Sequence, residues 1–173
     1  MKIYDLLAEK KTVVLKQWFD LILETYPEET TSFLKSQNAQ THNPVTQAIH
    51  EGIEGIYNGL VNEADAGKLD MYLDNIIRVR AVQDFSPSEA VSFIFSLKKV
   101  IRKELEKEIC DQNMFEEFLA LESRIDSLAN TCFEIYMKCR EKLYDIKANE
   151  VRNWTYRALH KTKLYKEVRT EEQ

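Results

Sequence analysis

Three histidines and three cysteines are the residues of this sequence best suited to metal or cofactor chemistry. They are His42, His50, His160, Cys110, Cys132 and Cys139. Helical metal sites use ligands three or four residues apart, and zinc or redox motifs use cysteines paired across two residues. No H-x-x-x-H, E-x-x-H or C-x-x-C spacing occurs in the chain. The spacing therefore predicts no metal site and no catalytic residues.

Haem is the one cofactor that a helical sensor could hold through a single histidine. The helix expected at 68–83, which would supply a proximal ligand, contains no histidine. His50 on the preceding helix is the candidate, and Tyr72 is a weaker one. A lone histidine on a helix is usually a surface or core residue. We therefore expect no cofactor, and a haem or redox-ligand sensor is the alternative function.

The cysteines show no sign of disulfide bonding. Cys132 and Cys139 are seven residues apart on one expected helix. A helix separates such residues by roughly 10 Å, which is too far for a disulfide. We expect reduced thiols, as in a cytoplasmic protein.

Composition and periodicity predict an all-α protein. The 173 residues include only four glycines and three prolines, and apolar residues recur at helical rather than alternating spacing. The length suits one domain. No run of 18 apolar residues and no signal-peptide pattern is found, so we expect a cytoplasmic protein without a transmembrane segment.

The clearest helix start lies at Ser86. Ser86 is a good N-cap, Pro87 suits the first helical position, and Glu89 completes a capping box. The helix that follows, to about Cys110, is apolar nearly all round over its first two turns. We therefore expect a central helix of a bundle, with Phe95 and its neighbours covered on every side.

Similar signals place the other helices of a bundle with five main helices. They are expected at about 3–24, 44–63, 68–83, 87–110 and from 114 onward, with a short helix at 27–35, a long polar loop at 36–43 and a turn at 64–67. Phe33 and Leu34 are expected to face inward on the short helix. Phe115 and Phe133 are expected to widen the buried stripe of the last helix.

Gly52, Gly55 and Gly59 lie on one face of the helix expected at 44–63. Each glycine costs about 1 kcal/mol relative to alanine inside a helix. We interpret the face as a close crossing of another helix, with a tolerated weak helix or a ligand pocket beside the crossing as alternatives.

Arg80 stands at a corner between two helices, near Asp84 and Glu89. A guanidinium in this position is expected to act as a structural clamp across the corner. Anion or partner binding is the alternative. Arg78 is expected to pair with Asp74, four residues earlier.

The charge of the chain is divided unevenly. Residues 138–169 hold ten Lys/Arg and four Asp/Glu, so the rest carries 14 basic and 25 acidic residues. We expect 140–165 to project as a helical stalk that forms a homodimer or docks a partner. Its expected contacts are Tyr144, Val151, Trp154 and Tyr156. A solvated helix, a membrane-surface helix and a nucleic-acid contact are the alternatives, and we expect no nucleic acid.

Several of these segments together resemble a known family. The matching pieces are Trp18 with 22–27, then 43–45, 77–91, 121–126 and 135–142. They resemble the N-terminal sensor domain of the stressosome RsbT co-antagonist proteins, the RsbRD N-terminal family. The pieces span most of the chain.

The resemblance implies a globin-like helical bundle without haem, dimeric through its last helices, that acts as a sensor or regulatory module. The sequence looks like the short, stand-alone members found in sulfate-respiring bacteria rather than a stressosome subunit, and we expect no output domain in the stretch that ends at Gln173. By analogy with those members, the partner would be a membrane electron-transfer complex. We therefore expect a non-enzymatic sensor or adaptor that acts through protein interactions, with a small ligand in the helical core as its input.

Overall fold

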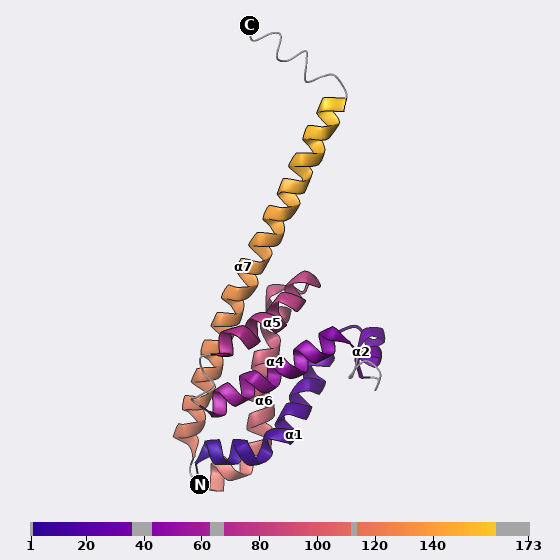
Figure 1. Cartoon of the computed structure of the whole chain (residues 1–173). Coiled ribbons are helices and arrows are strands. Elements are labelled where there is room, and N and C mark those ends of the chain that lie inside the picture. The colour runs from indigo at the N-terminus through magenta and orange to yellow at the C-terminus, as the bar shows by residue number, and fades with distance from the viewer. Residues whose placement is uncertain (1, 36–42, 63–67, 112–113, 162–173) are drawn as a thin grey trace. The chain divides into compact units, whose positions relative to one another are not determined.

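The computed structural model describes residues 2–35, 43–62, 68–111 and 114–161, and in these ranges the protein is all-α (Figure 1). Its helices are α1 (Ile3–Leu23), α2 (Glu28–Lys35), α4 (Pro44–Val61), α5 (Leu69–Val82), α6 (Pro87–Asp111) and α7 (Phe115–Lys161). The all-α prediction is confirmed, but the count of five main helices is slightly low, since six are described. The loop expected at 36–43 and the turn at 64–67 lie almost entirely outside the described residues.

Local capping chemistry explains where the helices begin. At α4, the Asn43 side chain accepts a hydrogen bond from the Val45 amide at 2.8 Å, and Pro44 takes the first position. At α6, the Ser86 amide donates to the Glu89 carboxylate at 2.9 Å, and Ser86 Oγ accepts from the Glu89 amide. Both starts lie where the sequence predicts them.

The corner between α5 and α6 is built by a residue in the left-handed region. Asp84 has φ 59°, and the Phe85 amide donates to the Arg80 carbonyl at 3.2 Å. This is the hydrogen bond of a Schellman motif, in which the left-handed residue turns the chain and the following amide satisfies a terminal helix carbonyl. The motif brings α6 back across the end of α5.

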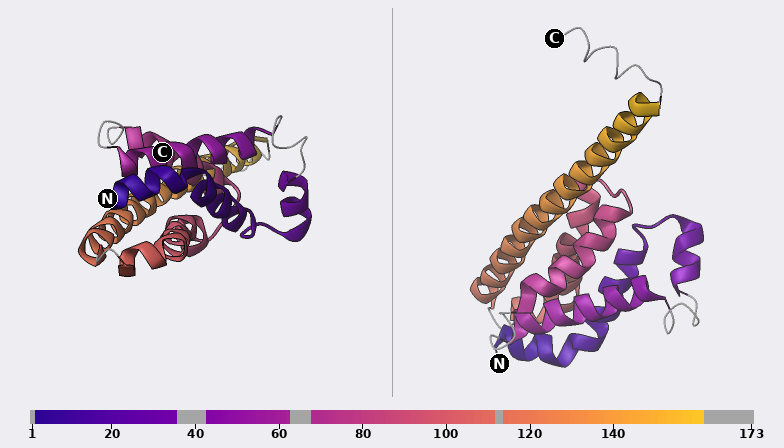
Figure 2. Two further views of the ribbon diagram at one scale, coloured as in Figure 1. Left: turned by 90° about the horizontal axis from the view of Figure 1, so that it is seen from below. Right: turned by 45° about the horizontal axis from the view of Figure 1, so that its top comes forward.

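The chain divides into two units, residues 1–137 and 138–173. In the first unit α1 packs on α4 and α6, and α4 packs on α5, as the views in Figure 2 show. Two buried polar side chains bond to main-chain carbonyls of neighbouring helices. Trp18 Nε1 donates to Phe93, and the Tyr57 hydroxyl donates to Leu7, each at 2.7 Å. These bonds satisfy polar atoms that would otherwise be costly to bury.

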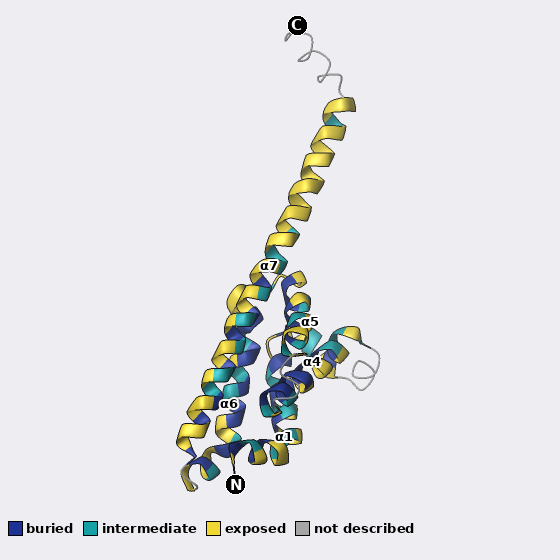
Figure 3. Ribbon diagram, turned by 60° about the vertical axis from the view of Figure 1, so that its left-hand side comes forward, coloured by how far each residue is buried: buried dark blue, intermediate teal, exposed yellow. Residues whose placement is uncertain are grey.

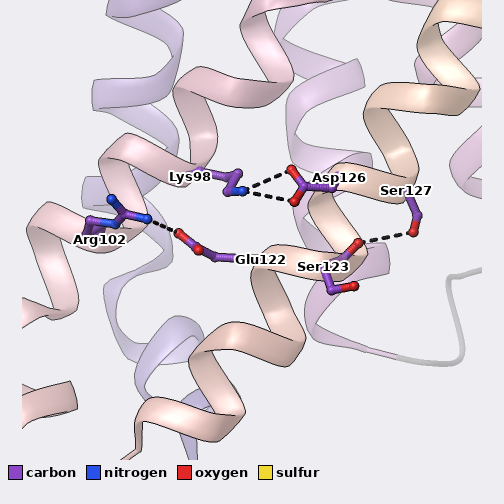
Figure 4. A network of polar contacts seen from close by, with 6 residues as sticks. All are labelled: Lys98, Arg102, Glu122, Ser123, Asp126 and Ser127. Atoms are coloured by element: carbon purple, nitrogen blue, oxygen red, sulfur yellow. Dashed lines mark hydrogen bonds and ion pairs between the residues drawn. The ribbon is translucent and has the colours of Figure 1, made fainter.

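The first part of α7 is joined to α6 by ion pairs (Figure 4). Lys98 Nζ lies 2.9 Å from Asp126 Oδ1, and Arg102 lies 2.6 Å from a Glu122 carboxylate oxygen. Exposed pairs of this kind contribute at most about 1 kcal/mol each. Because of these ion pairs, the charges of Lys98 and Arg102 on α6 are neutralised by carboxylates of α7.

Burial differs from expectation at four phenylalanines. The residues expected to be covered but found exposed are Phe33 (60%), Phe95 (46%), Phe115 (57%) and Phe133 (49%). In the first unit, neighbouring helices cover only one side of α7, so only a narrow stripe of its residues is buried. The side of α6 that carries Phe95 likewise has no described helix of the first unit covering it. The expectation that α6 is covered all round is wrong.

No disulfide bond joins the three cysteines, and only Cys132 is buried among them. Burial raises the pKa of the Cys132 thiol to about 12, whereas Cys110 is exposed. Because the thiolate is the reactive form, we expect a disulfide reagent at pH 8 to modify Cys110 rapidly and Cys132 only after unfolding. Mass spectrometry of the time course would measure this order. Equal rates at the two thiols would contradict the packing around Cys132.

Candidate interaction surfaces

The three glycines of α4 lie buried against side chains of α5. A methyl group built on Gly52 would lie 2.6 Å from Ile76 Cδ1, and one on Gly59 would lie 2.7 Å from Leu69 Cγ. A methyl group on Gly55 would overlap the Tyr72 ring at Cγ. These positions are filled by α5 side chains, so the face is a packing surface between two helices.

His50, the haem candidate, lies on α4 with its imidazole stacked on the Phe19 ring at a centroid distance of 3.9 Å. Burial lowers the pKa of His50, and the Glu54 carboxylate opposes this effect. The depression beside the ring measures about 290 Å³, at the lower limit of ordinary ligand pockets. Stacking accounts for the position of this histidine without a cofactor.

Arg80 is fully buried at the α5–α6 corner. Its Nη1 donates to the Glu89 carbonyl and its Nη2 to Thr25 Oγ1, each at 2.8 Å. The guanidinium carbon also lies 4.8 to 5.7 Å from the centroids of three aromatic rings, those of Tyr26, Phe85 and Phe93. Arg80 therefore links the end of α1 to the start of α6 through neutral acceptors and ring faces.

The acidic residues expected around Arg80 have other roles. The Glu89 carboxylate binds Ser86, which lowers the pKa of Glu89 through the side-chain and main-chain hydrogen bonds. Asp84 supplies the left-handed turn. Burial lowers the pKa of Arg80, an effect that Tyr26 and Glu89 oppose, and Arg80 Nε is buried without a hydrogen-bond partner among the described residues. The guanidinium stays protonated at neutral pH.

A groove of about 820 Å³ lies beside this corner, between the end of α1, the first half of α6 and one turn of α7. Its apolar wall includes Leu21, Val91, Phe95, Ala129 and Phe133. Thr25, which accepts from Arg80, also lines it. The volume is in the range of sites that bind ligands or partner side chains.

The candidate stalk residues lie in the second unit, where no described side chain is buried (Figure 3). Tyr144, Val151 and Trp154 are exposed, Trp154 by 72%. Tyr156 is also exposed, and its ring packs edge-on against His160 at 4.4 Å. Large apolar side chains gathered on one exposed helix usually mark an interaction surface. Whether residues 140–165 project as a stalk stays a prediction, and 162–165 lie outside the described residues.

Comparison with known families gives a match over most of the chain. The model of the RsbT co-antagonist protein rsbRD N-terminal domain matches residues 12–151, which is most of the chain. The chain belongs to this family. No curated protein and no solved structure gives a significant match. The globin-like arrangement implied by the resemblance therefore stays a prediction.

The rsbRD N-terminal family is one of regulatory, sensor-type domains related to the stressosome, and it is not a family of enzymes. Its members act through protein interactions. In the described part of the chain, no helix has the length and apolar character needed to cross a membrane. For a regulatory domain, the surfaces of interest are those that another protein could contact.

The sequence analysis named exposed residues of α7, whose role as contacts stays a prediction, and it missed the groove. A signal was present, because Ser88, Ser92 and Ser96 recur every four residues beside Phe95. A helix that is covered on every side should not repeat a polar residue at this spacing. The serines indicated an uncovered face of α6, which the dense run of apolar residues obscured.

Proposed function

We propose that this rsbRD N-terminal domain is a non-enzymatic, cytoplasmic regulatory or sensor domain that forms a homodimer through residues 138–161. The first unit would receive the signal or the partner. The paired helices of the second unit would join two copies and pass the signal on. Family membership supports the regulatory role.

The observation that carries the dimer is the exposure of large apolar residues at heptad spacing. Tyr144 and Val151 are seven residues apart, and Trp154 follows Val151 by three. This is the spacing of the a and d positions that meet in a two-stranded coiled coil. Exposed residues at these positions bury little surface in a single chain, and pairing with a second copy would bury them.

The double substitution Val151→Asp with Trp154→Asp is expected to dissociate the dimer. It places carboxylates where two copies would bury apolar side chains, so the dimer dissociation constant should rise by on the order of a hundredfold or more. Sedimentation velocity of the full chain over a range of concentrations would measure the shift.

The matched control is Ile146→Asp with Leu159→Asp, at exposed apolar residues outside this heptad register. It adds the same charge to the same helix and should leave the dimer intact. A dimer that survives the first pair of substitutions, or that both pairs disrupt equally, would refute the heptad seam.

A further inference from the structure

The groove beside Phe95 continues along α6. Phe95 and Lys99 line both the 820 Å³ groove and a second depression of about 470 Å³ on the same helix. The two together extend from Pro87 to Glu106, roughly 30 Å of helix. A surface of this length is longer than most small ligands and matches about five turns of a partner helix.

Some of the basic side chains of α6 form ion pairs with carboxylates of α7, and others do not. Lys98 and Arg102 are paired with carboxylates of α7, as Figure 4 shows. For Lys99 and Lys103, both exposed, the described residues supply no carboxylate within ion-pair distance. Glu106 lines the far end of the second depression, so the excess positive charge lies in the middle, next to Phe95.

We propose that this surface, the α6 groove, binds an amphipathic α-helix of a partner protein. Apolar side chains of that helix contact Phe95 and Phe133, and its carboxylates contact Lys99 and Lys103. Helix-in-groove recognition places apolar anchors at intervals of three and four residues, and α6 with the adjacent turn of α7 provides two walls for such a helix. The proposal rests on the regulatory function above, because it supplies the partner that a regulatory domain requires.

Charge favours an acidic protein over the exposed end of α7 from a second copy. Residues 138–161 hold seven Lys/Arg and three Asp/Glu. That segment would bring like charge to Lys99 and Lys103, which is unfavourable at an interface. A helix with glutamate or aspartate on the flanks of its apolar stripe gives the opposite sign.

The probe is a synthetic amphipathic helix with leucines at positions i, i+3, i+4 and i+7 of each repeat, glutamates on both flanks and a fluorescein label. A control peptide has the same sequence with every glutamate replaced by lysine. Titration of each with the full chain, followed by fluorescence anisotropy, is expected to show at least tenfold tighter binding of the acidic peptide, with weaker binding at higher salt. Equal binding of the two peptides, or none, would overturn the proposal.

Substitutions test which surface is used. Lys99→Glu with Lys103→Glu should weaken the acidic peptide at least tenfold and favour the basic one, and Phe133→Asp should weaken both. Lys107→Glu and Met71→Asp, at exposed residues outside the groove, should change neither. Because all of these side chains are exposed, the variants should keep the helical circular dichroism and melting temperature of the parent chain.

Two outcomes separate this proposal from the dimer. If Phe133→Asp abolishes dimerisation and Lys99→Glu with Lys103→Glu leaves peptide binding unchanged, a second copy covers the groove and the acidic-helix proposal is overturned. In the second outcome, Val151→Asp with Trp154→Asp leaves the dimer intact, but binding of the acidic peptide still depends on Lys99 and Lys103. The heptad seam is then refuted, and the groove proposal stands.

Discussion

Replacing Gly55 by alanine is expected to destabilise the protein by about 2 kcal/mol, although alanine is the better helix former. The added methyl group would overlap the Tyr72 ring at Cγ, the ring atom nearest the main chain. Rotation of the ring about Cβ–Cγ leaves Cγ in place, so either the Tyr72 side chain must change χ1 or α4 and α5 must separate. Urea denaturation followed by circular dichroism would measure the change in unfolding free energy.

The change in unfolding free energy caused by Gly55→Ala should reverse its sign when the Tyr72 ring is absent. In a Tyr72→Ala background, Gly55→Ala is expected to stabilise the protein by about 1 kcal/mol, because only the helix preference of alanine remains. The coupling energy between the two positions would then be about 3 kcal/mol. A destabilisation of the same size in both backgrounds would show that the Tyr72 ring is not the obstacle.

The neighbouring glycines provide graded controls. At Gly52 the atoms in the way are Cγ1 and Cδ1 of Ile76, and at Gly59 they are Cγ and Cδ2 of Leu69. The closest approaches there, 2.6 and 2.7 Å, are less severe than the overlap at Gly55. Alanine at either position should therefore destabilise the protein by less than alanine at Gly55.

Replacing Arg80 by alanine is expected to cost about 3 kcal/mol or more of unfolding free energy. The substitution leaves a cavity between three aromatic rings and removes both hydrogen bonds from the end of α5 to Thr25 and Glu89. The corner between α5 and α6 would lose the side chain that joins it to the end of α1. Chemical denaturation of the variant would measure the loss.

Arg80→Met tests whether Arg80 stabilises the protein through the volume of its side chain or through its charge. Methionine fills much of the same space without a charge to desolvate, and apolar replacements of buried ionic groups are often nearly neutral. We expect it to cost less than half as much as alanine, and Arg78→Ala, at an exposed residue of the same helix, to have little effect. If methionine costs as much as alanine, the guanidinium itself is required, and the packing explanation fails.

The sequence by itself determined the features of this protein that depend on short stretches of chain. Asn43 with Pro44 and Ser86 with Glu89 start helices where their side chains can reach nearby amides. Apolar periodicity gave the helices and most of their buried stripes, because a helix presents residues three and four apart on one face regardless of its neighbours. Family membership followed from the same local segments.

Only the tertiary structure decided which faces were covered and which partners the polar side chains took. Phe95 and Phe133 belong to apolar runs like those of buried residues, yet both are exposed because no described helix of the first unit covers them. Arg80 lies near two carboxylates in the sequence, yet it bonds to Thr25, which is 55 residues away. Spacing along a helix fixes the direction of a side chain, but the atoms that it meets are fixed by how the helices pack.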